Sequence, residues 1–208
     1  AQNLGKTTRM EAGYHTYNQW VDNQFSAQDD AAKQELKYNE MRHAAYTNFS
    51  GKLKSLNWQA GLRFEHSNIE IDNDPTSKYH CFLPQFSLQK TLPNKHSLKF
   101  SYRKSIDRPA IYHINPFVNQ IDSLKISHGN PELDPAYTHN VKLNYSGNIK
   151  SSYFSPELYF NYYDNQIQEI AIINENGITE QYSENIGKGY EYGLSLSASI
   201  KITDWWKF

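Results

Sequence analysis

Apolar and polar side chains alternate along most of this chain with a period of two residues. The clearest segment is YEYGLSLSASIKIT at 190–203, where leucine, alanine and isoleucine take turns with serine, lysine and threonine. Successive side chains of a pleated strand point to opposite faces, so this period indicates a β-strand. The pattern therefore predicts an all-β chain whose strands have one apolar and one polar face.

Alternation of this kind predicts about eight strands. They span residues 9–16, 39–52, 58–65, 82–92, 97–103, 141–146, 154–162 and 190–203. The connections at 19–35 and 107–136 are long, 72–79 is intermediate, and 53–57, 93–96 and 147–151 are short. The NENG turn at 174–177 departs from this order, because a hairpin signal stands where a long connection is due. AQDDAAKQEL at 27–36 has the composition of a short helix.

Strand length and loop order separate two kinds of sheet. Alternation alone also fits a soluble antiparallel sandwich with one buried face. Several strands, however, reach about ten residues, as a tilted strand needs to cross a bilayer, whereas soluble strands average about five to six. Short turns at one end and longer loops at the other are typical of outer-membrane barrels. The sequence therefore predicts an antiparallel transmembrane β-barrel segment with about eight up-and-down strands, in which Leu196 faces lipid and Ser197 faces the lumen.

Composition narrows the function classes. The 208 residues carry a net charge of -1, so the chain lacks the basic footprint of a nucleic-acid-binding protein. Mean hydropathy is -0.79, and no apolar run approaches the roughly 18 residues of a membrane helix. Cys81 is the one cysteine; it permits no internal disulfide and is expected to be a small residue at a strand start. No signal peptide precedes Ala1, which indicates a mature, cytosolic or excised chain.

Aromatic residues near the strand ends suit the girdles that flank the apolar band of a membrane barrel. These residues are Tyr14, Trp58, Tyr102, Tyr153, Tyr190 and Trp205.

Motifs for catalysis or metal binding are weak. The histidines and aspartates flanking loop 107–136 show no metal-ligand spacing. Asp72 and Asp74 resemble half of an EF-hand loop, but the glycine is missing and Leu83 replaces the glutamate. GKGYEYG at 187–193 has the wrong glycine spacing for a dinucleotide loop, and no serine stands in a nucleophile elbow. We therefore expect no enzyme, no metal and no cofactor.

Loop 107–136 holds the candidate site residues. Proline and Asn-Pro pairs initiate turns, and glycine supplies backbone freedom, so most of the distinctive residues are expected to shape the loop. They are Arg108, Pro109, Asn115, Pro116, Phe117, Gly129, Asn130 and Pro131. Arg108 is expected to pair with a loop carboxylate such as Asp134. Because loops on a rigid scaffold carry recognition, four side chains are candidates for contact with a ligand. They are Tyr112, His113, Phe117 and His128.

Two motifs of this loop resemble signatures of TonB-dependent outer-membrane receptors of the Bacteroidetes type. DRPAIYHINPF at 107–117 is similar to their RP…LNPF signature, and HGNPELDPAYTHNVKLNYS at 128–146 to the GNP signature that follows it. RHAAYTNFSGKL at 42–53 and WQAGLRFEHS at 58–67 resemble the preceding strands. Ala136 departs from the family's acidic residue at that position. The resemblance covers nearly the whole chain.

The resemblance implies a slice of a barrel of about 22 strands, closed in such receptors by a plug that engages TonB. Residues 1–208 would form part of one barrel domain, with no plug among them. The expected place is the outer membrane of a Gram-negative bacterium. The expected partners are outer-membrane lipid, the TonB system through the plug, and an unknown extracellular ligand, but no nucleic acid. Loop 107–136 would be extracellular and the turns 53–57, 93–96 and 147–151 periplasmic.

Two alternatives remain open from the sequence. One is a surface or soluble β-sheet binding module, and the other is a passive porin or structural barrel. The ligand class is equally open among iron chelates, glycans and peptides. An open slice would leave two unpaired edges, to be covered by another copy, by a larger assembly, or by closure into a small eight-stranded barrel.

Overall fold

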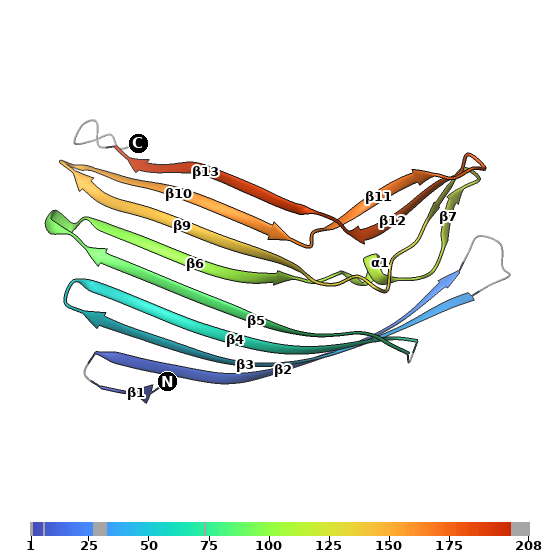
Figure 1. Cartoon of the computed structure of the whole chain (residues 1–208), viewed down its shortest axis with the longest axis horizontal. Coiled ribbons are helices and arrows are strands. Elements are labelled where there is room, and N and C mark those ends of the chain that lie inside the picture. The colour runs from blue at the N-terminus through green and yellow to red at the C-terminus, as the bar shows by residue number, and fades with distance from the viewer. Residues whose placement is uncertain (1, 6, 27–32, 73, 201–208) are drawn as a thin grey trace.

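A computed structural model describes residues 2–5, 7–26, 33–72 and 74–200. These ranges contain thirteen strands, where the sequence predicted about eight, together with one 3-10 turn and one short helix. Nine strands form one sheet, and the other four form a second sheet. Figure 1 shows the long strands side by side in one wall, with the smaller sheet at one end of it.

The wall consists of eight long strands and the two-residue strand β1. Its neighbours pair in the order β1-β2-β3-β4-β5-β6-β9-β10-β13. The bounds are β1 Gln2–Asn3, β2 Thr8–Ser26, β3 Lys33–Leu53, β4 Leu56–Ile71, β5 Asp74–Thr91, β6 Ser97–Asp107, β9 Ala136–Ile149, β10 Ser152–Asp164 and β13 Lys188–Ser199. All neighbours are antiparallel. Within the described ranges β13 pairs only with β10, so closure into a small barrel is wrong and the sheet stays open.

Several wall strands are longer than the sequence predicted. The segment 19–35 was expected to be a loop, but β2 continues to Ser26 and β3 begins at Lys33. The turn expected at 72–79 is also mostly strand, since β4 ends at Ile71 and β5 begins at Asp74. These extensions lie beyond the alternating stretches and are held by backbone pairing between strands, which needs no apolar face. Of the expected helix at 27–36, residues 33–36 are strand and the rest lies outside the described residues.

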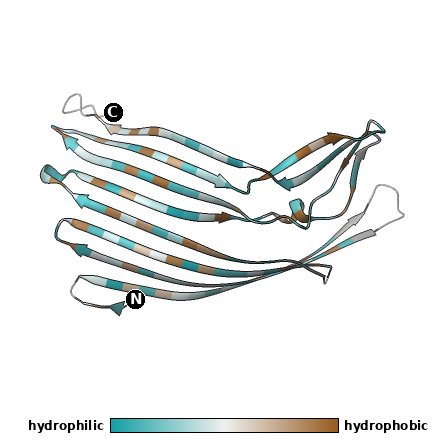
Figure 2. Cartoon of the chain, viewed as in Figure 1, coloured by the Kyte–Doolittle hydropathy of each residue, from teal (hydrophilic) through white to brown (hydrophobic). Residues whose placement is uncertain are grey.

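The strand register joins the alternating positions into rows across the wall. One row is apolar on all eight long strands: Met10, Phe49, Ala60, Phe86, Tyr102, Val141, Phe160 and Tyr192. The next row on the opposite face is mostly polar: Arg9, Ser50, Gln59, Ser87, Ser101, Lys142, Tyr159 and Gly193. Figure 2 shows the resulting bands of brown and teal along each strand. The predicted two-faced sheet is confirmed.

The apolar face is not covered by any part of the described chain. Leu158, Leu194 and Leu196 are 54%, 66% and 64% exposed, each in an apolar row. Contiguous exposed apolar surface of this kind marks contact with a membrane or a partner. Leu196 pairs with Pro156, while Ser197 pairs with Ser155 on the other face, as the alternation predicted.

A second sheet is formed by the two long connections of the wall. Its strands are β7 Asn119–Asp122, β8 Lys125–Ser127, β11 Ile167–Ile173 and β12 Thr179–Asn185. Their order is β11-β12-β8-β7, and the parallel pair β12 and β8 joins the two connections. The NENG turn closes the β11–β12 hairpin inside the connection from β10 to β13. That connection is therefore long, so the NENG turn is no exception to the alternation. The exception is the connection from β4 to β5, which is short where a longer one was predicted.

The helical elements are very short. They are η1 Pro93–Lys95, in the turn between β5 and β6, and α1 Ile111–Ile114, in the connection between β6 and β9. In the part of the chain that the structure describes, no helix has the length and apolar character to cross a membrane.

Candidate functional site

The connection from β6 to β9, residues 108–135, folds back onto the wall instead of standing away from it. The buried core of the molecule lies at this contact. Its wall members are Leu36, Tyr38, Ile69, Ile71 and Tyr79, and its loop members are Ile114 and Leu133. The wall members share the face of the polar rows, which thus becomes apolar toward this end of the strands. Burying each large apolar side chain there contributes about 1.5–3 kcal/mol, so the loop is held by packing.

Arg108 anchors the start of this loop to the wall. Its Nη2 donates to Oε2 of Glu65, and its Nε donates to the hydroxyl of Tyr79 at 3.1 Å. The Glu65 side chain is only 4% exposed and accepts a second hydrogen bond from Nε of Arg63 at 2.5 Å. The prediction that Arg108 pairs with Asp134 is wrong. Arg108 directly follows β6 and reaches across the polar face to β4 and β5, a contact that only the strand register creates.

The two sequence motifs meet through their backbones. The amide of Gly129 donates to the carbonyl of Asn115 at 2.7 Å, and the amide of Asn130 donates to the carbonyl of His113 at 2.6 Å. A Cβ on Gly129 would lie 2.6 Å from both of these carbonyl oxygens, so the close approach requires glycine.

Two asparagines fix the local turns of the same motifs. Asn115 Oδ1 accepts the amide of Phe117, and Asn130 Oδ1 accepts the amide of Glu132, each at 3.0 Å. A side-chain oxygen that accepts an amide two residues on forms an Asx turn. Of the motif prolines, Pro109 is buried, Pro131 half-buried and Pro116 exposed.

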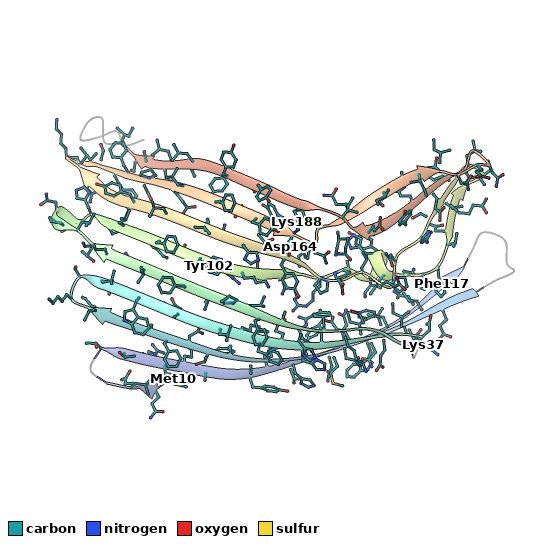
Figure 3. All side chains as sticks on the ribbon, viewed as in Figure 1. Met10, Lys37, Tyr102, Phe117, Asp164 and Lys188 are labelled. Carbon is teal, nitrogen blue, oxygen red and sulfur yellow. The ribbon has the colours of Figure 1, made fainter. Side chains whose placement is uncertain are left out.

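The four candidate ligand residues lie in different surroundings. Tyr112 is 72% exposed, with its ring centroid 3.9 Å from that of His113. Nδ1 of His113 accepts the amide of Ala110 at 3.2 Å, and burial lowers the pKa of this imidazole. Phe117 packs against the buried core beside α1 (Figure 3). Contact of these residues with a ligand stays a prediction.

His128 links the two long connections. Its Nδ1 lies 2.9 Å from the carbonyl oxygen of Gly129, and its Nε2 lies 3.0 Å from Oε1 of Glu180 on β12. Its ring stacks on that of Tyr182, with centroids 5.5 Å apart and planes 2° from parallel. The Gly129 carbonyl and the Glu180 carboxylate together raise the pKa of His128. His128 thus contacts the β11–β12 hairpin, whereas Tyr112 lines the hollow described below and His128 does not.

Asn185 joins the same two connections through its amide. Its Oδ1 accepts the amide of Asp134 at 2.8 Å, and its Nδ2 donates to the carbonyls of Asp134 and Asn165 at 2.9 and 3.1 Å. Asn165 in turn donates to the carbonyl of Pro135 at 3.2 Å. The loop 108–135 and the hairpin 165–187 therefore form one folded unit.

A hollow of about 590 Å³, called the groove below, lies between residues 108–115 of the loop and strands β2 and β3 of the wall. Tyr17, Gln19 and Arg42 line it from β2 and β3, and Tyr112 and Asn115 line it from the loop. The sequence analysis missed the three wall residues. Arg42 stands on the polar face of β3, while Tyr17 and Gln19 lie on β2 beyond the alternating stretch 9–16, so nothing local distinguishes them from other residues of a wet surface.

Metal ligands do not converge in this region. Across residues 2–5, 7–26, 33–72 and 74–200, no three His, Cys, Asp or Glu side chains gather where they could hold a metal ion.

The sequence matches a known protein family. The family described as "Outer membrane protein beta-barrel family" matches residues 1–208. The chain belongs to this family. A barrel wall in the outer membrane of a Gram-negative bacterium accounts for the open sheet with one exposed apolar face, and the polar face of this family member is accordingly the lumen face. The Bacteroidetes type stays a prediction.

Solved structures of receptors and transporters share this fold. The siderophore receptor PirA from Acinetobacter baumannii superposes with a TM-score of 0.58 at 17% identity, over 98% of this chain and 36% of that one. The FrpB iron transporter from Neisseria meningitidis (F5-1 variant) gives a TM-score of 0.67 at 13% identity, over 96% and 32%. The hemophore receptor HasR from Serratia marcescens gives 0.66 at 13% identity, over 92% and 40%.

The family member therefore spans well under half of these receptors, and the expected barrel slice is confirmed as a fold. A comparison with curated proteins finds no match.

Proposed function

We propose that this chain is part of the barrel wall and extracellular loops of a TonB-dependent receptor that takes up a ligand across the outer membrane. One observation carries the proposal. The loop 108–135 packs its own apolar core onto the lumen face of β3, β4 and β5 and leaves the groove open beside it. A loop folded into the lumen narrows the mouth and presents side chains to an incoming molecule, whereas a porin keeps a water-filled channel.

In this receptor the chain makes and breaks no bonds. It belongs to one barrel domain, whose apolar rows face lipid and whose polar rows line the lumen. A plug domain elsewhere in the protein would fill the lumen and engage TonB, and energy from the inner membrane would release the ligand inward. The solved relatives support transport as the class, since their names describe a siderophore receptor, an iron transporter and a hemophore receptor.

The test uses the full-length protein in two measurements. Reconstituted in a planar bilayer, it should show no steady conductance, and in detergent it should bind the purified periplasmic domain of TonB. A steady conductance without TonB binding would instead identify a passive porin. A full-length protein that stays monodisperse in buffer without detergent would identify a soluble binding module.

A further inference from the structure

We propose that the end of the wall with the short connections binds the negatively charged headgroups of anionic phospholipids in the leaflet that borders it. In the predicted topology this is the periplasmic leaflet. The proposal goes beyond ligand uptake, because it concerns only the wall and its lipid face. Three features of this end carry it: a lysine in an unusual backbone conformation in each short connection, a further lysine on the apolar face, and a lack of carboxylates around them.

The short connections β3–β4, β5–β6 and β9–β10 each contain a lysine with a positive φ. The angle is 53° at Lys54, 63° at Lys95 and 56° at Lys150. Side chains other than those of asparagine and aspartate are uncommon in this region, and turns that need it usually have glycine or asparagine. At the opposite end of the wall the residues with positive φ are of the usual kind, Asp72 and Asn165. Turn geometry alone therefore does not account for a lysine in all three connections.

These lysines stand where the apolar face ends. All three are exposed, and Figure 1 shows their connections together at one end of the wall. Leu53, directly before Lys54, is 66% exposed, and Ile149, directly before Lys150, is 57% exposed. Lipid headgroups begin where the hydrocarbon ends, so an ammonium group that directly follows the apolar face lies at their level.

Lys90 adds a cation from within the apolar face. It pairs with Leu56 on β4 and with Leu98 on β6, and it is exposed. A charge is costly in hydrocarbon, and lysine lowers this cost by burying its methylene stem and extending its ammonium group to the membrane surface. The nearer surface is the end with the short connections, because β5 ends at Thr91. Lys90 can therefore reach the same layer of headgroups as the lysines of the turns.

No carboxylate neutralises these cations in the part of this end that the structure describes. Aspartate and glutamate are absent from its described segments, which are residues 2–5, 7–10, 50–60, 86–101, 143–156 and 192–200. Within the described chain none of the four lysines forms an ion pair. At the other end of the wall, by contrast, β6 and β10 end at Asp107 and Asp164. The excess positive charge is therefore confined to one end, where it attracts anions.

The arrangement of the lysines favours a layer of lipid over a single acidic protein. Three of them stand one to a connection, on separate hairpins of the wall, so the charges follow its margin instead of gathering at one point. A leaflet surrounds a barrel at one level and can meet all of them at once. Lysine also suits this partner, because its ammonium group binds phosphate as a point charge and needs no fixed geometry.

The test measures the lipid preference of the full-length protein in vesicles of phosphatidylcholine. A trace of spin-labelled phosphatidylglycerol or spin-labelled phosphatidylcholine is added, and electron paramagnetic resonance gives the fraction of label that the protein immobilises. We expect the wild type to prefer phosphatidylglycerol at least about twofold, because each lysine near the headgroups adds to the attraction. The preference should disappear at about 1 M salt, where the screening length falls to about 3 Å.

Substitutions in the turns test the source of the preference. The triple variant Lys54→Asn, Lys95→Asn and Lys150→Asn should lose most of it and should still fold, because asparagine tolerates a positive φ better than lysine does. The corresponding triple variant with arginine should keep the preference, because the three charges remain. Heat-modifiable migration shows that each variant is folded.

The matched control removes three charges from places that do not face lipid. Lys52 and Lys99 lie on the lumen face at the same end, where they pair with Asn57 and Gln89, and Lys125 lies on β8. The triple variant Lys52→Gln, Lys99→Gln and Lys125→Gln should keep the preference of the wild type.

Four outcomes would overturn the proposal. They are equal immobilisation of both lipids by the wild type, a preference that survives the high salt, an asparagine variant that keeps the preference, and an arginine or control variant that loses it. The salt series on the wild type decides the question even if the asparagine variant does not fold. None of these measurements involves TonB or a transported ligand, so their failure would leave the proposed receptor function untouched.

Discussion

Single residues of the loop act mainly through space and backbone geometry. Gly129 is the clearest case, because its amide and its missing Cβ allow the two motifs to touch. Asn115 and Asn130 close turns with their side-chain oxygens, and Asn185 binds three backbone groups of the neighbouring connections. The motif residues around the groove therefore determine where Tyr112 stands, and need not touch a ligand themselves.

Gly129→Ala should loosen the loop. The added methyl group meets backbone atoms of Asn115 and His113 at 2.6 Å, and overpacking of this kind costs about 1–3 kcal/mol. The expected result is faster hydrogen exchange at the amides of Gly129 and Asn130 and faster proteolysis in 108–135, while heat-modifiable migration of the barrel stays unchanged. Gly5→Ala is the control, since a Cβ there meets nothing within 4 Å. Unchanged exchange in the Gly129 variant would show that the two motifs are not held by this contact.

His128 makes the link between the two connections depend on pH. Both of its ring nitrogens face acceptors, and only the protonated imidazole can donate to both. The Gly129 carbonyl and the Glu180 carboxylate raise its pKa above the ordinary value of about 6.5, so its contribution is complete below that value and is lost as pH rises through the folded-state pKa. We expect protection of β8 and β12 from hydrogen exchange, corrected for intrinsic rates, to decrease from pH 5 to pH 8. His128→Gln, which cannot titrate, should remove this dependence; a profile that survives the substitution would count against the link.

At the level of the elements, each long strand has two faces that contact different solvents, lipid on one side and water on the other. Rows such as Trp58, Leu88, Phe100, Leu143, Leu158 and Leu194 form an unbroken apolar face across neighbouring strands. On the other face, Lys142 donates to Glu157 at 2.8 Å and Gln85 to Asn48 at 2.8 Å, as side chains in a wet lumen do. The family assigns the first face to lipid and the second to the lumen.

Arginine substitutions on adjacent residues of β13 test this assignment. Leu194 is 66% exposed in an apolar row, and Ser195 pairs with Glu157 on the lumen face. In the full-length protein Leu194→Arg should lower the free energy of unfolding by about 2–4 kcal/mol if it lies near the midplane, because hydrocarbon cannot solvate the charge. Ser195→Arg should cost little. Unfolding in denaturant and heat-modifiable migration of outer-membrane fractions are the measurements, and equal effects of the two variants would contradict the assignment.

The molecule as a whole has two unlike ends. The short connections β3–β4, β5–β6 and β9–β10 lie at one end of the wall, and the folded unit of loop and hairpin lies at the other (Figure 1). This polarity comes from the two long connections, β6–β9 and β10–β13, which leave the wall at the same end. Which end faces the medium stays a prediction that follows from outer-membrane barrels in general.

Cysteine labelling of intact cells would determine the orientation. In a Cys81→Ala background, Ser123→Cys in the long loop should react with an impermeant maleimide. Ser151→Cys, in the short turn between β9 and β10, should react only after the outer membrane is opened. Both serines are exposed, so accessibility of the side chain does not bias the comparison. Labelling at position 151 but not at 123 in intact cells would reverse the topology.

The local sequence was enough to predict the β-strands, their two unlike faces and the family. The reason is that each residue of a strand faces either lipid or water. This alone produces an alternation with a period of two, whichever strand lies beside it. The motifs at 107–117 and 128–146 also predicted which type of outer-membrane barrel the chain resembles. They could do so because their turns are formed by residues that are neighbours in sequence.

Contacts between residues far apart in the sequence could not be predicted from the sequence alone. Arg108 meets Glu65 across 43 positions and His128 meets Glu180 across 52, and the parallel pairing of β8 with β12 joins separate connections. Such pairs depend on the register of several strands at once, and a shift of one residue would turn every side chain to the other face. The groove and the ion pairs of Arg42 and Arg108 beside it therefore appear only in the folded protein.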